Sequence, residues 1–260
     1  MNLVSALVVA KNEENNLYDC LSSLKDTDEI VLILDKTTDK SKEIAEKFNC
    51  NINEGSWDNE GERRNFGIKK CKYEWIIEVD ADERLSDGLL EEAKLAIKNL
   101  DFNITGYFLI PFNNYIGSKK VLHGWGASWG VTHKPCLFHR KSKKWGKEAI
   151  HPSLELGKKL GILKLPINHY IDNNLSDMIK RLDRYSSANA MQLRQSQKKL
   201  PSLAITIRRS ITRFWKCYIS RKGYKEGKWG FIIALFAALY IFLSYMKAEL
   251  EDSSEKPKLK

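Results

Sequence analysis

The first hundred residues alternate short apolar runs with segments whose apolar residues recur at helical spacing. The runs Leu3 to Ala10, Ile30 to Leu34 and Trp75 to Val79 are nearly continuous, which is typical of strands covered on both faces. The segments between them carry apolar residues three or four positions apart, as in amphipathic helices. This repetition predicts an α/β fold with a mostly parallel central sheet flanked by helices. We expect this domain over residues 1–172.

Each of the three apolar runs stops at polar side chains. The first run is followed by Lys11-Asn-Glu-Glu14, the second by Asp35 and the third by Asp80-Ala-Asp82-Glu83. Parallel strands end at the same edge of a sheet, and ligands of open α/β sheets bind at that edge. We therefore expect one carboxylate-rich edge with a ligand site.

Asp80 and Asp82 are the candidate metal ligands. Strand residues two apart point the same way, so the two carboxylates converge if the backbone stays extended through Ala81. Oxygen ligands suit Mg²⁺ or Mn²⁺, which commonly share their coordination with substrate phosphates. The alternative is a solvated turn at the strand end. A turn is our expectation for the second such pattern, Asp26-Thr-Asp28, because it precedes a strand.

A nucleotide at this edge needs partners other than a glycine loop. The chain has neither G-x-G-x-x-G nor G-x-x-x-x-G-K-[ST], so we expect the metal, Arg63 and Arg64 to hold the phosphates. The alternative for both arginines is a solvated charge on an exposed helix. Asp35 can accept hydrogen bonds from a nucleobase or a ribose hydroxyl, and Glu13 is expected beside it.

An ordered series of motifs resembles the inverting family-2 glycosyltransferases, in particular the bacterial branch of lipopolysaccharide core β-1,4-glucosyltransferases. The series covers nearly the whole chain and comprises Val4 to Glu14, Asp28 to Asp35 with Thr38-Asp39, Trp57, Arg64-Asn65, Trp75 to Arg84, Tyr107, Asn113, Tyr115-Ile-Gly117, His123-Gly-Trp125, Leu137-Phe138, Arg140, Ile150-His151, His169-Tyr170 and Arg221 to Phe231.

The resemblance implies a GT-A-type fold, a nucleoside-diphosphate sugar donor such as UDP-glucose, and a Mn²⁺ or Mg²⁺ ion. It implies that Asp35 recognises the nucleobase by hydrogen bonding, that Asp80 contacts the ribose or a metal-bound water, and that Asp82 binds the metal. It also makes His169 a candidate ligand of the metal or the diphosphate, with a structural role as the alternative. Relatives often have Glu directly after the histidine that matches His151, whereas this chain has Pro152.

Inversion by direct displacement needs a carboxylate that takes the proton from the attacking hydroxyl. Glu148 and Glu155 are the only acids between Asp101 and Asp172. We expect one of them to be the general base, with Glu155 favoured. The alternative for each is an ordinary surface glutamate.

Residues 107–147 are rich in aromatic side chains, and sugars present flat C–H faces that stack on such rings. Trp125 and Trp129 lie in a loop flanked by glycines. We expect Trp125 to form a platform for the acceptor, with His151 nearby as a further ligand of the acceptor or of a phosphate. Core packing is the alternative for the tryptophan, and a structural role is the alternative for the histidine.

The two parts of the chain differ in charge. Residues 1–100 contain 14 Lys and Arg against 22 Asp and Glu, whereas residues 101–260 contain 29 against 11. The basic part predicts an anionic partner. From 173 to 250 the pattern is helical and includes Phe231 to Met246, a run without charge that is shorter than the roughly 20 residues of a membrane span. We expect this helix to lie in the interface of an anionic membrane; a short span or a buried helix of a homo-oligomer are the alternatives.

These expectations combine into one function. The N-terminus lacks the features of a secretory signal, the five cysteines are scattered as in a reducing cytoplasm, and residues 251–260 form a polar tail. We expect a metal-dependent enzyme, attached peripherally to the inner face of the cell membrane, that moves a hexose to a lipid-linked saccharide such as lipopolysaccharide core. A polyprenyl phosphate acceptor is one rival. A basic nucleic-acid-binding protein is a rival of another class, but it leaves the acidic strand ends unexplained.

Overall fold

The computed structural model describes residues 3–101, 103–126, 130–147, 152–196 and 199–251. The chain forms two compact units. The first unit contains residues 1–113 and 133–169, and the second contains residues 114–132 and 170–260. The described residues of segment 114–132 thus belong to the same unit as the C-terminal helices.

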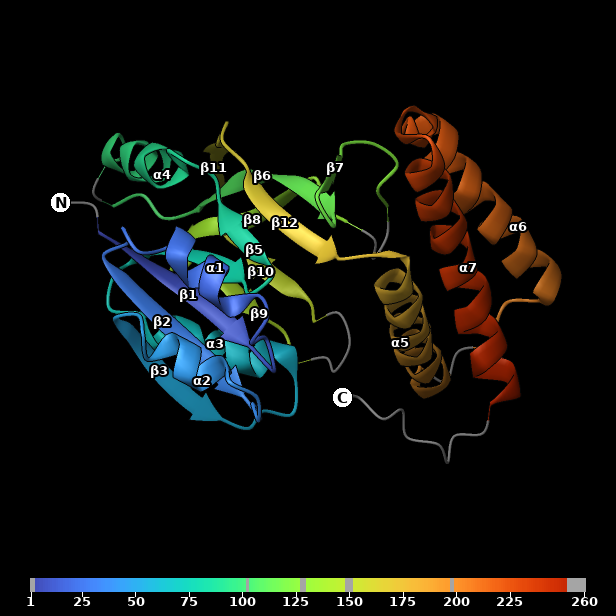
Figure 1. Cartoon of the computed structure of the whole chain (residues 1–260), viewed down its shortest axis with the longest axis horizontal. Coiled ribbons are helices and arrows are strands. Elements are labelled where there is room, and N and C mark those ends of the chain that lie inside the picture. Colours follow the sequence, from blue (N-terminus) through green and yellow to red (C-terminus); the bar gives the residue numbers. More distant parts are fainter. Residues whose placement is uncertain (1–2, 102, 127–129, 148–151, 197–198, 252–260) are drawn as a thin grey trace. The chain divides into compact units, whose positions relative to one another are not determined.

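Four parallel strands form one side of the sheet in the first unit. Their order is β3-β2-β1-β4, and Figure 1 shows them in blue and teal. All seven residues of β1 are buried, as its apolar run predicts. The strands are β1 (Val4–Ala10), β2 (Glu29–Asp35), β3 (Cys50–Gly55) and β4 (Trp75–Asp80), and the intervening helices are α1 (Leu17–Ser23), α2 (Ser41–Ala45) and α3 (Glu60–Lys70).

The helix α3 lies directly on β1 and β2. A Cβ atom at Gly67 would lie 2.5 Å from a methyl carbon of Leu7 and 3.1 Å from a side-chain carbon of Ile33. The glycine therefore permits the close approach of this helix to the sheet. The same helix carries Arg63 and Arg64.

The other side of the sheet is mainly antiparallel. Strand β8 pairs antiparallel with β4 and β6, and β12 pairs antiparallel with β5. The sheet is thus mixed, with the parallel pairing concentrated in its first four strands, and it confirms the predicted GT-A-type α/β class. The remaining elements are β5 (Glu83–Leu85), α4 (Leu89–Lys98), β6 (Tyr107–Ile116), β7 (Lys119–Val121), β8 (His133–His139), β9 (Lys143–Trp145), β10 (Leu154–Leu156), β11 (Lys159–Ile162) and β12 (Ile167–Asp172).

Three helices dominate the second unit. They are α5 (Leu175–Gln195), α6 (Leu203–Trp215) and α7 (Lys228–Leu250); α6 continues into a π-helical turn over Lys216–Ser220, and a 3₁₀ turn over Gly223–Glu226 precedes α7. The helix α7 contacts both α5 and α6 and lies between them in Figure 1.

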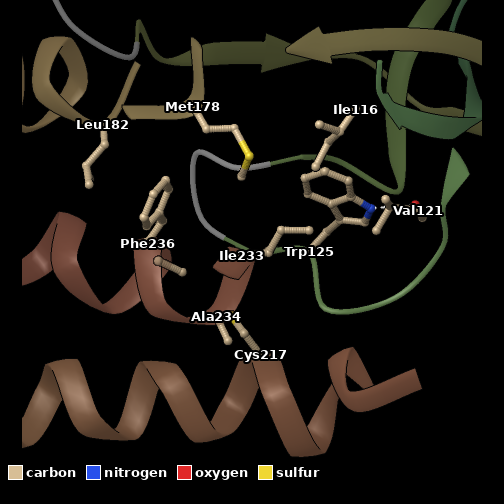
Figure 2. Packing of buried hydrophobic residues seen from close by; sticks show 10 residues of the cluster. Ile116, Val121, Trp125, Met178, Leu182, Cys217, Ile233, Ala234 and Phe236 are labelled. Atoms are coloured by element: carbon tan, nitrogen blue, oxygen red, sulfur yellow. Dashed lines mark hydrogen bonds between the residues drawn. The ribbon is translucent and has the colours of Figure 1, made fainter. Parts of the chain in front are cut away.

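The core of the second unit joins these helices to the segment after β6. Met178 from α5, Ile233 and Phe236 from α7 and the ring of Trp125 belong to one buried cluster (Figure 2). The indole Nε1–H of Trp125 donates a hydrogen bond of 2.7 Å to the carbonyl oxygen of Val121. A buried indole with its only donor satisfied is a stable core residue.

The helix α7 is longer than its charge-free run. Over the residues that the structure describes, it is one helix of 23 residues that is long and apolar enough to cross a membrane by length and composition. Of its most apolar 18-residue window, 44% is buried inside the protein. A large part of its apolar surface is therefore used in the core of the second unit.

A buried charge network links α3, β4 and β9. The carboxylate of Glu78 accepts hydrogen bonds from Arg64 Nη1 at 2.5 Å and from Lys143 Nζ at 2.6 Å. The side chains of Glu78 and Lys143 are each only 4% exposed. Burial raises the pKa of Glu78, but the attraction of Lys143 and Arg64 outweighs it, so that the pKa lies below the ordinary value of 4.5.

We expect Glu78→Ala to lower the free energy of unfolding by about 3–5 kcal/mol, because it leaves two cations without their buried carboxylate. Urea unfolding at pH 7 measures this. A carboxyl group with a depressed pKa stabilises the fold above its unfolded pKa and loses that effect as pH falls. The wild-type free energy of unfolding therefore decreases below about pH 4.5. The free energy of unfolding of Glu78→Ala decreases less over the same pH range. Glu74→Ala, at an exposed position just before β4, is the control and costs under about 1 kcal/mol. Equal losses in both variants would contradict the prediction.

Candidate functional site

The carboxyl ends of β1, β2 and β4 lie at one edge of the first unit. Val9 of β1 pairs with Asp80, and Ala10 pairs with Leu34 directly before Asp35. Glu13 belongs to this edge as well: burial raises its pKa, and the nearby charges of Asp82 and Asp80 raise it further. The predicted carboxylate-rich edge is therefore present.

The two aspartates of the Asp80-Ala-Asp82 motif make different contacts. Strand β4 ends at Asp80, and Ala81 and Asp82 form a turn before β5. The condition of an extended backbone through Ala81 is therefore not met, and the alternative of a turn at the strand end holds for these residues. Asp80 accepts hydrogen bonds from Arg64 Nη2 at 2.7 Å and from Lys134 Nζ at 3.2 Å, whereas Asp82 Oδ2 lies 3.4 Å from His169 Nε2.

The turn brings Asp82 into a different cluster of potential ligands. Asp82, Glu83 and His169 each offer one ligand atom, and these atoms lie within 4.8 Å of one another. The antiparallel pairing of β5 with β12 places His169 opposite Glu83. Two carboxylates and an imidazole are a suitable donor set for a divalent cation such as Mn²⁺. Of the predicted metal residues, Asp82 and His169 belong to this cluster, while Asp80 is held by cations.

Glu83 and Lys134 are residues of the site that the sequence reasoning missed. Glu83 is 1% exposed; it accepts a hydrogen bond from the backbone N–H of Asp80 at 2.9 Å and another from Lys134 Nζ. Lys134 lies on β8, 54 residues from Asp80. Its only sequence signal is a lysine at the start of a strand, which is too common to indicate a site. Glu83 directly follows Asp82 and belongs to the predicted acidic edge, but the spacing alone gave it no role as a ligand.

The cations determine the charge state of these acids. Burial raises the pKa of Asp80, but Arg64 and Lys134 outweigh it and hold the pKa well below its usual range. Burial also raises the pKa of Glu83, where Lys134 lowers it and Asp80 raises it, and the result is a raised pKa. Asp80 is therefore an ionised carboxylate that already has two cationic partners.

Asp35 and the two arginines are part of ion pairs. Asp35 accepts a hydrogen bond from the backbone N–H of Trp57 at 3.1 Å and another from Arg63 Nη1 at 3.1 Å. Arg64 is buried and bonds to Glu60 as well as to Glu78 and Asp80. Neither arginine is a freely solvated charge.

A cavity of about 350 Å³ opens beside these residues. Its lining includes the charged residues Asp80, Glu83 and Lys134 and the apolar residues Trp145, Pro152 and Leu154. The ring of Trp145 also lies 5.0 Å from the guanidinium of Arg64. The cavity thus combines charged groups with an aromatic surface, a combination that suits a sugar or a nucleotide.

The remaining predicted residues lie elsewhere. Glu155 is on β10, is 72% exposed and has Lys144 as a partner at 3.7 Å. Glu148 and His151 lie outside the described residues. Trp125 is 5% exposed in the core of the second unit, so the prediction of an exposed acceptor platform is wrong and the core-packing alternative holds. Its hydrogen bond to Val121 and the apolar neighbours around it explain this burial.

The chain is similar to several known proteins. An uncharacterised glycosyltransferase of Rickettsia conorii is 24% identical over 98% of this chain and 92% of its own length. The lipopolysaccharide core biosynthesis glycosyltransferase LpsC of Rhizobium meliloti is 23% identical over 94% of this chain and 91% of its own length. The crystal structure of S. aureus TarS 1–349 in complex with UDP-GlcNAc has a TM-score of 0.48 at 15% identity, covering 95% of this chain and 90% of that chain. Residues 5–151, more than half of the chain, match Glycosyl transferase family 2, and the chain belongs to this family.

Proposed function

We propose that this protein is a metal-dependent hexosyltransferase that moves glucose from UDP-glucose to a lipid-linked saccharide such as lipopolysaccharide core. The observation that carries the proposal is the cluster of Asp82, Glu83 and His169 at the acidic edge of the sheet. Family membership supports glycosyl transfer, and the name of the Rhizobium meliloti relative supports the choice of acceptor. Membership also favours an enzyme over a nucleic-acid-binding protein.

The donor would lie along the acidic edge. Asp35 would accept a hydrogen bond from the nucleobase, while its own contacts with Arg63 and the N–H of Trp57 keep its carboxylate oriented. Asp80 would face the ribose or a metal-bound water from its position between Arg64 and Lys134.

Asp82 and His169 would hold Mn²⁺ or Mg²⁺, with Glu83 as a third ligand. The donor set fits such an ion because Asp82 is partly exposed and lies opposite the imidazole of His169. A divalent ion here would offset the charge that develops on the departing diphosphate. Arg63, on the helix that begins at this edge, would add a positive charge near the nucleotide.

The transfer itself needs a base from this chain. A hydroxyl oxygen of the acceptor forms a bond to the anomeric carbon as the bond to the diphosphate oxygen breaks, and a carboxylate takes the hydroxyl proton. Glu155 and Glu148 remain the proposed bases. The exposed position of Glu155 on the β9-β10 hairpin leaves its carboxylate accessible to an acceptor.

We also propose that residues 1–172 form the catalytic domain and that residues 173–250 attach it to the inner face of the cell membrane. The charge of the basic part of the chain supports an anionic lipid surface as the partner. A polyprenyl phosphate is the alternative acceptor, since it is also presented at such a surface. Association of two copies through the C-terminal helices is the alternative to lipid contact.

The metal proposal is tested with Asp82→Asn. We expect Mn²⁺ affinity, measured by isothermal titration calorimetry, to fall at least about tenfold. We expect Mn²⁺-dependent turnover of UDP-glucose to fall at least about a hundredfold, because an amide oxygen is a weaker ligand than a carboxylate. Asp26→Asn, in the other Asp-x-Asp pattern, is the matched control. Unchanged turnover in Asp82→Asn would refute the metal role.

The donor is identified separately, by measuring the thermal shift of the protein with Mn²⁺ and each of a panel of nucleotide sugars.

Lys134 provides a second test of the same cluster. Its ammonium group neutralises Asp80 and Glu83, so Lys134→Met should raise the affinity for Mn²⁺ by about tenfold, equivalent to 1.4 kcal/mol. Lys134→Arg keeps the charge and should leave the affinity nearly unchanged. Lys144→Met, at an exposed lysine, controls for the overall loss of charge. Equal Mn²⁺ affinities in Lys134→Met and the wild type would contradict this electrostatic effect of Lys134 on the cluster.

The base is tested by comparing Glu155→Gln with Glu148→Gln at saturating donor. The variant that lacks the base should transfer at least about a hundredfold more slowly, because general-base catalysis contributes at least this factor. Donor affinity should not change, since neither residue is proposed to contact the nucleotide. If neither variant is slowed to this extent, the base is a different residue.

A further inference from the structure

The helix α6 is amphipathic, but it buries small polar side chains and exposes most of its large apolar ones. It packs on α7 with the small polar side chains of Thr206 and Ser210 buried, and the hydroxyl of Ser210 donates a hydrogen bond to the carbonyl oxygen of Thr206. Most of its large apolar side chains are exposed instead, although Phe214 is partly buried against the core of the second unit. Surface helices normally bury their apolar stripe, so this helix exposes what most helices cover.

The exposed side chains form one continuous ridge. Leu203, Ile207, Ile211, Trp215 and Ile219, here called the α6 ridge, are four residues apart and are between 42% and 54% exposed. Residues four apart form a ridge along a helix. The ridge continues into further aromatic residues, because Phe214 contacts Trp215 on one side and Phe231 on the other, with ring centroids 5.3 and 5.7 Å apart. An exposed apolar surface of this kind marks an interaction site.

Exposed basic side chains lie on the same helical segment as the α6 ridge. Arg208, Arg209 and Lys216 on the same helix segment are exposed, and the sequence contains no Asp or Glu from Arg184 to Lys225. A second copy of this chain would present the same cations and be repelled. An anionic bilayer offers phosphates for the cations and acyl chains for the ridge, and a tryptophan is well placed where the two regions meet.

The helix α7 is less suited to this role, although its sequence is more apolar. Ile233, Ala234 and Ala237 are fully buried in the cluster of Figure 2. Part of its apolar surface, 44% of the most apolar 18-residue window, is therefore already buried inside the protein, whereas the residues of the α6 ridge are all at least 42% exposed.

We propose that α6, and not the charge-free run of α7, is the element that enters an anionic membrane surface. The α6 ridge lies at the boundary of headgroups and acyl chains, and Arg208, Arg209 and Lys216 contact lipid phosphates. This inference deepens the membrane attachment proposed above and rests on it, but it does not depend on the identity of the sugar or of the acceptor.

The test uses the full chain with vesicles of phosphatidylcholine and phosphatidylglycerol at a 70:30 ratio and physiological ionic strength. Co-sedimentation of the wild type is compared with that of the double variant Ile207→Asn and Ile211→Asn. We expect the vesicle affinity of the double variant to fall at least about tenfold, because two apolar side chains no longer leave water. Ile162→Asn, at a similarly exposed isoleucine of the first unit, is the matched control and should bind like the wild type. Circular dichroism and thermal unfolding establish that all variants are folded.

A second pair of measurements tests the charge. Arg208→Gln combined with Arg209→Gln should weaken binding to the anionic vesicles, and vesicles of pure phosphatidylcholine should bind the wild type weakly. Three results would overturn the proposal. The first is wild-type vesicle binding by the Ile207 and Ile211 double variant. The second is retention of wild type and variant alike in membranes washed with alkaline carbonate, and the third is loss of a dimer in sedimentation velocity without loss of vesicle binding.

Turnover of UDP-glucose in detergent-free solution is measured in parallel. Intact turnover without vesicle binding refutes this inference alone, and vesicle binding without turnover refutes the proposed enzyme function alone.

Discussion

The candidate site depends on the neutralisation of three acids that lie within six residues at the end of the central strand. Glu78, Asp80 and Glu83 are held by Arg64, Lys143 and Lys134. Buried carboxylates without such partners would take up protons or destabilise the fold. The cations come from α3, β8 and β9, so the acidic edge exists only when these elements have assembled around β4.

The acids at this strand end differ in how fully the protein itself engages them. Glu78 has both of its oxygens engaged inside the protein, and Asp80 has a cation at each oxygen. Asp82 lies beyond them on the turn and faces His169. The ordered charges behind the site would keep it in one geometry while a charged ligand binds and leaves, which is the preorganisation that electrostatic catalysis requires.

In the second unit, hydropathy alone does not determine which apolar residues are buried and which are exposed. Its core uses α7 and the segment around Trp125, and this leaves the apolar residues of α6 on the surface beside arginines. Hydropathy alone ranks α7 as the membrane element, because it has the longest charge-free run. Packing weakens this argument, because 44% of the most apolar 18-residue window of α7 is already buried inside the protein.

Local pattern determined the first half of the fold. The apolar runs of β1, β2 and β4, buried on both faces, and the helices between them require a parallel sheet, and that sheet places Asp35 and Asp80 at one edge. The motif series was likewise sufficient to identify the family, because an ordered set of short motifs is far more specific than any one of them.

Only the tertiary structure decided which side chains meet at that edge. The turn at Ala81 separates Asp80 from Asp82, and the pairings of β8 with β4 and of β12 with β5 bring Lys134 and His169 to the acids from 54 and 87 residues away. Burial of Trp125 and exposure of the α6 ridge were decided in the same way. The sequence determines which residues are apolar, charged or strand-forming, since these are local properties. The partner of each residue depends on contacts between distant segments, and those contacts exist only in the folded chain.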